Sequence, residues 1–303
     1  MKMKIVANNV DKHFGKFKAV DKTDIVVESG TIHGLLGSNG AGKTTLMKVL
    51  AGIYKADNGT VLYDDAPIFE NVSTKRDVLF INDIPFYFPG ATINKMAEYY
   101  RAMYPNFSNM RFNTLCELFK LNPKKPLSQM SKGMKRQASF ILAFSSKPKV
   151  MLLDEPFDGL DPIVRRQVKN IMMQDIANHR LTVLASSHNL REMEDLCDAV
   201  SIMHEGHVLI SQDLNEVKGS HCKLQIAFKE LPSEDFYKDL NVVHKSIKGR
   251  IITCILRGDI SNVEEKVSKY NPLMYDILPL TLEEIFAYEM GEIGYEIENI
   301  IIE

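Results

Sequence analysis

The residues best suited to chemistry lie in a glycine-rich run near residue 40, which fits the pattern G-x-x-x-x-G-K-[ST]. The run consists of Gly37, Ser38, Asn39, Gly40, Ala41, Gly42, Lys43, Thr44 and Thr45. Its glycines let the backbone approach phosphate oxygens, and N–H groups at the start of a helix bind anions. The Lys43 ammonium suits the β- and γ-phosphates, and the Thr44 hydroxyl suits Mg²⁺. The run predicts a nucleoside triphosphate site; the alternative is a chance glycine-rich turn.

Two carboxylates follow a short apolar run further along the chain. Residues 150–153 read Val-Met-Leu-Leu, as expected of a parallel strand buried on both faces, and Asp154 and Glu155 come next. An aspartate at the end of such a strand can hold Mg²⁺, and the following glutamate can orient or deprotonate an attacking water. We therefore expect Asp154 at the metal and Glu155 at the water. The alternative is an ordinary carboxylate pair at a strand end.

These residues need a scaffold, and the sequence predicts an α/β fold. Residues 31–36 read as an apolar strand and 45–50 as a helix, so the glycine-rich run joins a strand to a helix. Another apolar run lies at 182–185, with helical spacing between it and the strand at 150–153. Because strands that alternate with helices favour a parallel sheet, we expect one here. From about residue 90 to 146 the apolar spacing is helical, which predicts a helical insert.

The length of 303 residues allows one large domain and a smaller one. We assign residues 1–218 to the nucleotide-binding domain. Beyond it, residues 222–228 alternate between apolar and polar, as in a half-buried strand, and residues 281–284 form a capping box that opens a last helix. We therefore predict a small C-terminal α+β domain over 219–303, with an accessory or dimerisation role.

The composition excludes several classes of protein. A formal net charge of −2 gives no electrostatic footprint for nucleic acid, so we expect no nucleic acid partner. The four cysteines are scattered without a C-x-x-C pair, which favours reduced, buried thiols. No apolar run approaches the roughly 18 residues that span a bilayer, and residues 1–4 do not begin a signal peptide. We expect a protein that is soluble by itself and cytoplasmic.

The order of these motifs resembles that of the ATP-binding cassette (ABC) ATPases that drive ABC transporters, over residues 4 to about 215. The run at 37–45 matches the Walker A motif of that family, and residues 150–155 match Walker B. Residues 156–161 look like the D-loop that follows, and Ser187-His188-Asn189 fits the switch histidine near the γ-phosphate. The resemblance implies the P-loop NTPase fold of the ABC ATPases, with a helical signature subdomain.

Further site residues come from the same resemblance. It implies ATP and Mg²⁺ as the bound groups, and Glu155, His188 and Lys43 as the catalytic residues. Phe14 stands where the family stacks an aromatic ring on adenine, and Asp161 of the D-loop is expected to contribute to nucleotide binding. A core aromatic and a structural histidine are the plainer interpretations of Phe14 and His188.

The family signature L-S-G-G-Q is matched only in part, by residues 130–134. Ser131 and Gly133 are kept, whereas Lys132 and Met134 depart from the pattern. A serine at a helix N-terminus offers a hydroxyl and N–H groups to phosphate, and the glycine permits close approach. In this family the signature serves the ATP of the other subunit. The resemblance thus implies a head-to-tail dimer with a second copy or a homologous ATPase subunit.

A second departure follows the apolar residues 78–81. The family usually has a glutamine there, but this chain has Asn82-Asp83, and we place Asp83 at the glutamine position. Its carboxylate can meet Mg²⁺ or the attacking water, so we count it among the metal residues. The alternative is a plain turn residue before Pro85.

An aromatic segment lies directly after this position, at residues 85–89, with Tyr99, Tyr100 and Tyr104 close behind. In the family, this region receives a coupling helix from the membrane subunit. Residues 86–88 lie beside prolines in a loop, which favours an exposed apolar docking surface. Packing within the helical insert is the alternative for the other rings.

The Lys-Gly-Met-Lys signature and the tail residues 282–286 look similar to bacterial exporters of antibiotics and amphipathic peptides, in which ATPase and membrane polypeptides are separate. We therefore expect an ATP-hydrolysing subunit that powers antibiotic, drug or peptide export through a separate transmembrane permease. It would attach through that permease to the cytoplasmic face of the membrane. The alternative is a soluble regulatory ABC ATPase, or one that acts on ribosomes or DNA.

Overall fold

The protein is described by a computed structural model that covers residues 3–258 and 262–292. The chain divides into two compact units. The first contains the residues up to 189 together with 196–211, and the second contains 190–195 and the residues from 212 onward. The sequence placed its domain boundary after residue 218, which lies within helix α8 (Leu214–Gly219). Each unit is described by itself.

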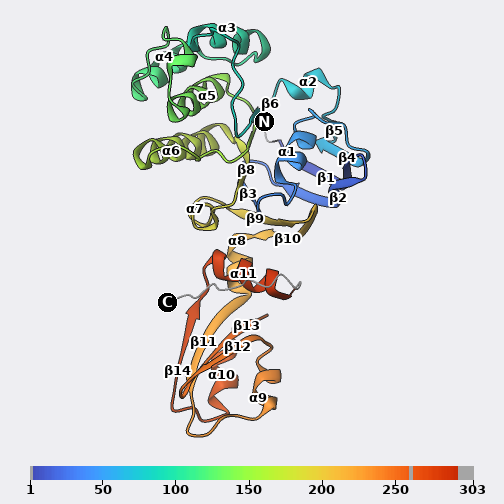
Figure 1. Cartoon of the computed structure of the whole chain (residues 1–303), viewed down its shortest axis with the longest axis vertical. Coiled ribbons are helices and arrows are strands. Elements are labelled where there is room, and N and C mark those ends of the chain that lie inside the picture. The colour runs from blue at the N-terminus through green and yellow to red at the C-terminus, as the bar shows by residue number, and fades with distance from the viewer. Residues whose placement is uncertain (1–2, 259–261, 293–303) are drawn as a thin grey trace. The chain divides into compact units, whose positions relative to one another are not determined.

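A six-stranded sheet forms the centre of the first unit, in the order β10-β9-β3-β8-β7-β6 (Figure 1). Its strands are β3 (Ile32–Leu36), β6 (Val78–Ile81), β7 (Val150–Leu153), β8 (Thr182–Ser187), β9 (Ala199–His204) and β10 (His207–Asp213). The pairs β3–β8, β3–β9, β7–β8 and β6–β7 are parallel, as predicted. Strands β3, β7 and β8 are buried along their whole length, which explains their unbroken apolar runs.

An antiparallel sheet of order β2-β1-β4-β5 completes the strand layers of this unit. Its strands are β1 (Ile5–Phe14), β2 (Phe17–Val27), β4 (Asn58–Tyr63) and β5 (Ala66–Pro67), and α2 (Val72–Lys75) follows them. Helix α1 (Lys43–Leu50) shares one hydrophobic core with both sheets. Its Leu46, Met47 and Leu50 are fully buried there. The helix that follows the glycine-rich run is therefore fixed by packing.

The helical insert predicted between residues 90 and 146 contains α3 (Ile93–Met103), α4 (Asn109–Leu118), the 3₁₀ turn η1 (Leu127–Gln129) and α5 (Lys132–Ser146). These helices lie together with α6 (Pro162–His179), apart from α1 and the antiparallel sheet (Figure 1). Each of these four α-helices begins with a side chain that accepts a hydrogen bond from a backbone N–H. The capping residues of α3, α4, α5 and α6 are, in that order, Thr92, Ser108, Ser131 and Asp161. These caps satisfy N–H groups that have no partner within the helix.

The second unit is the predicted small α+β domain, an antiparallel sheet of order β12-β13-β11-β14. Its elements are α7 (Leu190–Glu194), α8, β11 (His221–Ala227), α9 (Glu234–Asp239), β12 (Val242–Lys248), β13 (Ile251–Arg257), α10 (Val263–Ser268), β14 (Met274–Pro279) and α11 (Leu282–Glu292). Phe236 and Val267, from α9 and α10, are fully buried in its core. The predicted capping box is present, because Thr281 and Glu284 exchange hydrogen bonds at the start of α11.

Two further expectations concern the whole chain. All four cysteines are free and buried, as predicted. Within residues 3–258 and 262–292, no helix is both long enough and apolar enough to cross a membrane.

Candidate nucleotide site

The glycine-rich run joins β3 to α1, and its shape depends on two glycines that touch other backbone segments. A Cβ on Gly37 would lie 2.2 Å from the carbonyl oxygen of Met203, and one on Gly42 would lie 2.3 Å from that of Ala19. Gly40 also has a positive φ, but its missing Cβ faces open space. The loop is therefore held closely by β9 and β2 at its ends, while its middle stays accessible.

A hollow of about 360 Å³ lies over this loop. It is lined by Phe17, Ala19, Asn39, Gly40, Ala41, Gly42, Lys43, Thr44, Thr45, Asp83 and Glu155. Most of the predicted phosphate-binding residues thus surround a single space, together with the predicted base. Gly37 and Ser38 do not line the hollow but shape the loop beneath it, since their carbonyls accept hydrogen bonds from Lys43.

The Lys43 ammonium is buried and held by its own loop. Its Nζ donates to the carbonyls of Gly37, at 2.7 Å, and Ser38, at 3.1 Å, and it lies 3.8 Å from Oε1 of Glu155. Burial lowers the pKa of Lys43, while the carboxylates of Glu155 and Asp154 oppose that change. A cation so placed can meet anionic phosphate oxygens with little rearrangement.

Thr44 and Asp154 form the part of the site that suits Mg²⁺. The Thr44 hydroxyl donates to Oδ2 of Asp154 at 2.9 Å, and the Ser186 hydroxyl donates to Oδ1 at 2.7 Å. Asp154 is fully buried at the end of β7, so both of its oxygens are fixed. A hydroxyl and a carboxylate side by side are the hard oxygen ligands that Mg²⁺ prefers, and these residues therefore fit the ion.

Glu155 is oriented by contacts with Ser186 and His188 and by its backbone conformation. Its backbone N–H donates to the Ser186 hydroxyl at 3.0 Å, and its Oε2 lies 3.0 Å from Nδ1 of His188. Its φ of +45° places it in the left-handed region, which turns the side chain away from the strand direction. Burial raises the pKa of Glu155, and His188 and Lys43 partly offset that rise. A half-buried carboxylate with a raised pKa is suited to take a proton from water.

His188, the predicted switch histidine, and Phe14, the predicted adenine-stacking aromatic, differ in what they contact. His188 contacts the predicted base directly, as the resemblance implies. Phe14 instead packs edge-on against Tyr54, with ring centroids 5.7 Å apart. Phe17, which is opposite Phe14 across the hairpin and is 65% exposed, is the aromatic that lines the hollow. Sequence reasoning missed Phe17; its position three residues after Phe14, across Gly15, was the available signal.

Three further predicted nucleotide residues, from the signature and the D-loop, also lie outside this hollow. Ser131 and Asp161 cap α5 and α6 through their own side chains. Gly133 packs against the D-loop, because a Cβ there would lie 2.8 Å from the carbonyl oxygen of Gly159. Their role at a nucleotide stays a prediction. Within this chain, Gly133 lies against the D-loop, which ends at Asp161.

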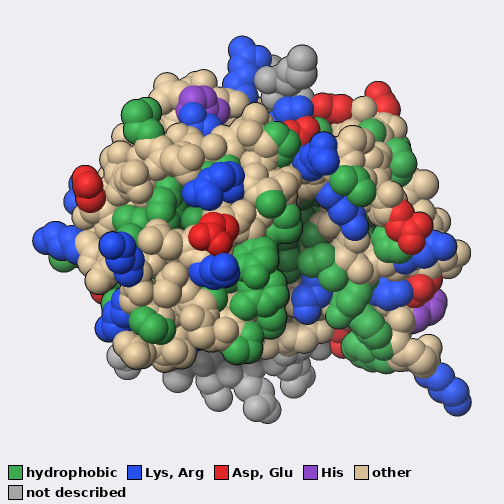
Figure 2. All heavy atoms as spheres, turned by 90° about the horizontal axis from the view of Figure 1, so that it is seen from above, with side chains coloured by type: hydrophobic (Ala, Val, Ile, Leu, Met, Phe, Trp, Pro, Cys, Tyr) green, Lys and Arg blue, Asp and Glu red, His purple; other side chains and the backbone are tan. Residues whose placement is uncertain are grey.

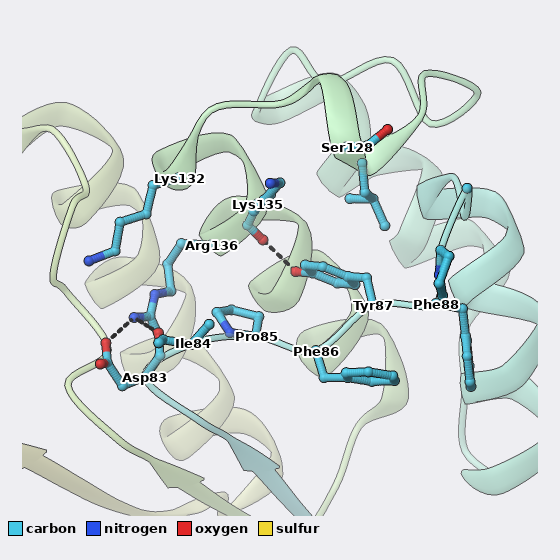
Figure 3. Close-up of a pocket in the computed structure, with 13 residues that line it drawn as sticks. Asp83, Ile84, Pro85, Phe86, Tyr87, Phe88, Ser128, Lys132, Lys135 and Arg136 are labelled. Carbon is cyan, nitrogen blue, oxygen red and sulfur yellow. Dashed lines mark hydrogen bonds and ion pairs between the residues drawn. The ribbon is translucent and has the colours of Figure 1, made fainter.

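Asp83 lines the hollow over the glycine-rich run and also a second, larger one of about 680 Å³. We call the larger one the groove; it is lined by residues 83–90 with Leu127, Ser128, Lys132, Lys135 and Arg136. Figure 3 shows Arg136 reaching from α5 to Asp83, with Phe86 and Phe88 further along the same loop. Sequence reasoning missed Arg136, which carried no motif signal.

Comparison with known proteins identifies the family. The ABC transporter family model matches residues 20–158. An uncharacterized ABC transporter ATP-binding protein of Synechocystis sp. is 32% identical over 92% of this chain and 80% of its own length. The chain belongs to the ABC transporter ATP-binding proteins. As in that family, it is the ATP-binding and ATP-hydrolysing subunit of a transporter.

Other relatives agree with this assignment. The ABC transporter ATP-binding protein YtrB of Bacillus subtilis is 29% identical to this chain. The alignment covers 90% of this chain and 96% of YtrB. A solved structure described as an ATP binding subunit of an ABC transporter aligns with a TM-score of 0.66 at 24% identity. That alignment covers 71% of this chain and 91% of the solved one, and it confirms the ABC ATPase fold.

Proposed function

We propose that this ABC ATPase powers the export of an antibiotic, a drug or an amphipathic peptide through a separate transmembrane permease. The observation that carries the proposal is the similarity to bacitracin transport ATP-binding proteins named BcrA. The Enterococcus faecalis protein is 29% identical over 82% of this chain, and the Bacillus licheniformis protein is 31% identical over 72%. In this proposal the subunit binds the cytoplasmic face of the membrane through the permease.

The chemistry assigned to the site follows from its contacts. When bound at Thr44 and Asp154, Mg²⁺ neutralises phosphate charge. Glu155 accepts the proton of the attacking water, and the His188 imidazole 3.0 Å away fixes the direction of its carboxylate. Lys43, held at the carbonyls of its own loop, stabilises the charge at the γ-phosphate with little rearrangement.

We assign the remaining nucleotide contacts to a second ATPase subunit, either another copy or a homologue. Ser131, Gly133 and Asp161 lie outside the hollow that contains Lys43. The Ser131 turn nevertheless opens a 15-residue helix whose first N–H groups suit an anion. Two ATP molecules held between two such surfaces would clamp the dimer, and hydrolysis would release it.

The groove supplies the proposed docking surface for the permease. Phe86 and Ile84 are about three-quarters exposed, at 74% and 73%, in the loop that follows Asp83. Lys132 and Lys135 line the same groove. Figure 2 shows one face of the molecule on which hydrophobic side chains gather along a hollow, with Lys and Arg side chains close by. An amphipathic helix with an apolar anchor and an acidic residue fits this surface.

The proposal can be tested by co-expressing this protein with the transmembrane permease that co-purifies with it. The complex should be purified through the permease, placed in vesicles, and measured for ATP hydrolysis and for outward movement of labelled bacitracin. Substrate-stimulated ATPase activity and movement away from the ATP side support the proposal. The proposal is contradicted if the permease and the substrate leave the rate of ATP hydrolysis unchanged. It is also contradicted if labelled bacitracin moves toward the side of the membrane that holds ATP.

A further inference from the structure

Arg136 is a buried cation that lies outside the sequence motifs named above. Its side chain is 1% exposed, although the residue lies in the second turn of α5 close to the groove. The guanidinium donates to the carbonyl of Asn82 at 3.0 Å, to the carbonyl of Asp83, and to Oδ1 of Asp83 at 3.0 Å. Burial of a guanidinium costs free energy unless the group is paired, so these three contacts are the ones that compensate its burial.

The partner of this cation lies at the edge of the nucleotide site. Asp83 lines the hollow together with Lys43 and Glu155, and its side chain is 43% exposed. Arg136 does not line that hollow. An unpaired carboxylate at Asp83 would add negative charge beside the phosphates, in a site that already holds Asp154 and Glu155.

Two lysines also line the groove. The carbon chain of Lys132 extends along Gly159 of the D-loop. Lys135 contributes its backbone carbonyl to the Tyr87 hydroxyl. Figure 3 shows the ion pair between Arg136 and Asp83, with Lys132 beside it.

We propose that Arg136 is a positioning residue that neutralises Asp83 and holds it in place, so that this acidic side chain is compatible with bound ATP. The pair Asp83–Arg136 then acts as one neutral unit at the position that follows β6. A purely structural Arg136 would only fix the two carbonyls of the 82–83 loop. The two roles differ in one consequence: only the charge-based role depends on the Asp83 carboxylate.

The test measures equilibrium ATP binding by calorimetry in the full-length protein, with EDTA present so that Mg²⁺ does not contribute. We expect Arg136→Gln to weaken ATP binding about tenfold, because one uncompensated charge then faces the phosphates. The double variant Asp83→Asn/Arg136→Gln should return to within about twofold of the wild type. A double variant as weak as Arg136→Gln overturns the proposal in favour of a structural role.

Three further variants complete the test. Arg136→Lys keeps the charge, so its ATP affinity should stay within about threefold of wild type even if Arg136→Gln does not fold; a tenfold loss overturns the charge-based role. Arg101→Gln on α3 removes an exposed arginine of the same subdomain and should leave ATP binding unchanged. The inference rests on the proposed nucleotide position, which Lys43→Ala tests separately. Wild-type ATP affinity in Lys43→Ala would overturn that position and the inference with it.

Discussion

The nucleotide hollow and the groove, both in the first unit, share Asp83 in their walls, yet they differ in the side chains that line them. The nucleotide hollow contains backbone groups of the glycine-rich run together with Lys43 and Glu155, whose charged side chains have partners within the same unit. The groove is formed by aromatic and aliphatic side chains that stay exposed, such as Phe86 and Ile84. The chain therefore positions the phosphate-binding and catalytic side chains of this hollow by itself. The apolar side chains of the groove, in contrast, are removed from water only when another protein covers them.

The sharpest way to break this contrast is to remove the base from the nucleotide hollow. Glu155→Gln keeps the shape and a hydrogen-bonding side chain but cannot accept a proton, so ATP turnover should fall about 10³-fold. Phosphate release measures turnover, and equilibrium binding should show that ATP is still held. Glu117→Gln on α4 is the control and should hydrolyse ATP normally. Normal hydrolysis by Glu155→Gln would remove Glu155 from its role.

The close backbone contacts of the glycine-rich run predict a smaller but still large effect on stability. Gly42→Ala places a Cβ 2.3 Å from a carbonyl oxygen, and we expect a loss of about 3 kcal/mol or more in unfolding free energy. Gly40→Ala has the same left-handed strain but meets no atom, so it should cost only about 1–2 kcal/mol. Chemical denaturation without nucleotide compares the two. Equal losses would show that conformational strain alone governs this loop.

On the groove side, Phe86→Ala should weaken association with the permease about 30-fold, the loss typical of one aromatic anchor. Its effect on hydrolysis by the isolated protein should be less than twofold, because Phe86 lies outside the nucleotide hollow. Met110→Ala on α4 removes an equally exposed apolar side chain away from the groove and serves as the control. Affinity should be measured with the permease in detergent. Equal losses in both variants would mean that the groove is not the docking surface.

The smallest expected effect concerns pH. The base must be deprotonated, so hydrolysis is lost as the pH falls through the pKa of Glu155, which burial holds above its ordinary value. His188 opposes that rise, and His188→Gln should therefore move the acidic limb of the rate profile a few tenths of a pH unit upward. Rates from pH 4.5 to 8 measure the shift. A limb that moves downward contradicts the assigned contact.

Much of the nucleotide site could be predicted from the sequence because its residues are adjacent in short motifs. Strand β7 was predicted because its complete burial leaves an unbroken apolar run. The sequence patterns described above do not identify β1 and β2, which form a long hairpin that turns at Gly15. Polar residues and bulges in the hairpin interrupt the alternation that identifies a strand.

Contacts between distant segments were beyond the reach of sequence patterns. Phe17 enters the hollow because the hairpin folds over the glycine-rich loop. Arg136 reaches Asp83 across 53 residues of sequence, and nothing in the spacing of either residue predicts the ion pair. In the second unit, β12 and β14 were missed because they lie at the edges of the sheet, where exposed residues weaken the apolar pattern.

The contact between Gly133 and Gly159 has a consequence for variation in this protein. The turn that presents Ser131 and the loop that leads away from Glu155 touch with no room for a single methyl group. A side chain at Gly133 can be accommodated only if the D-loop backbone moves as well. A library of substitutions at position 133 alone, selected for folded protein, should therefore return glycine.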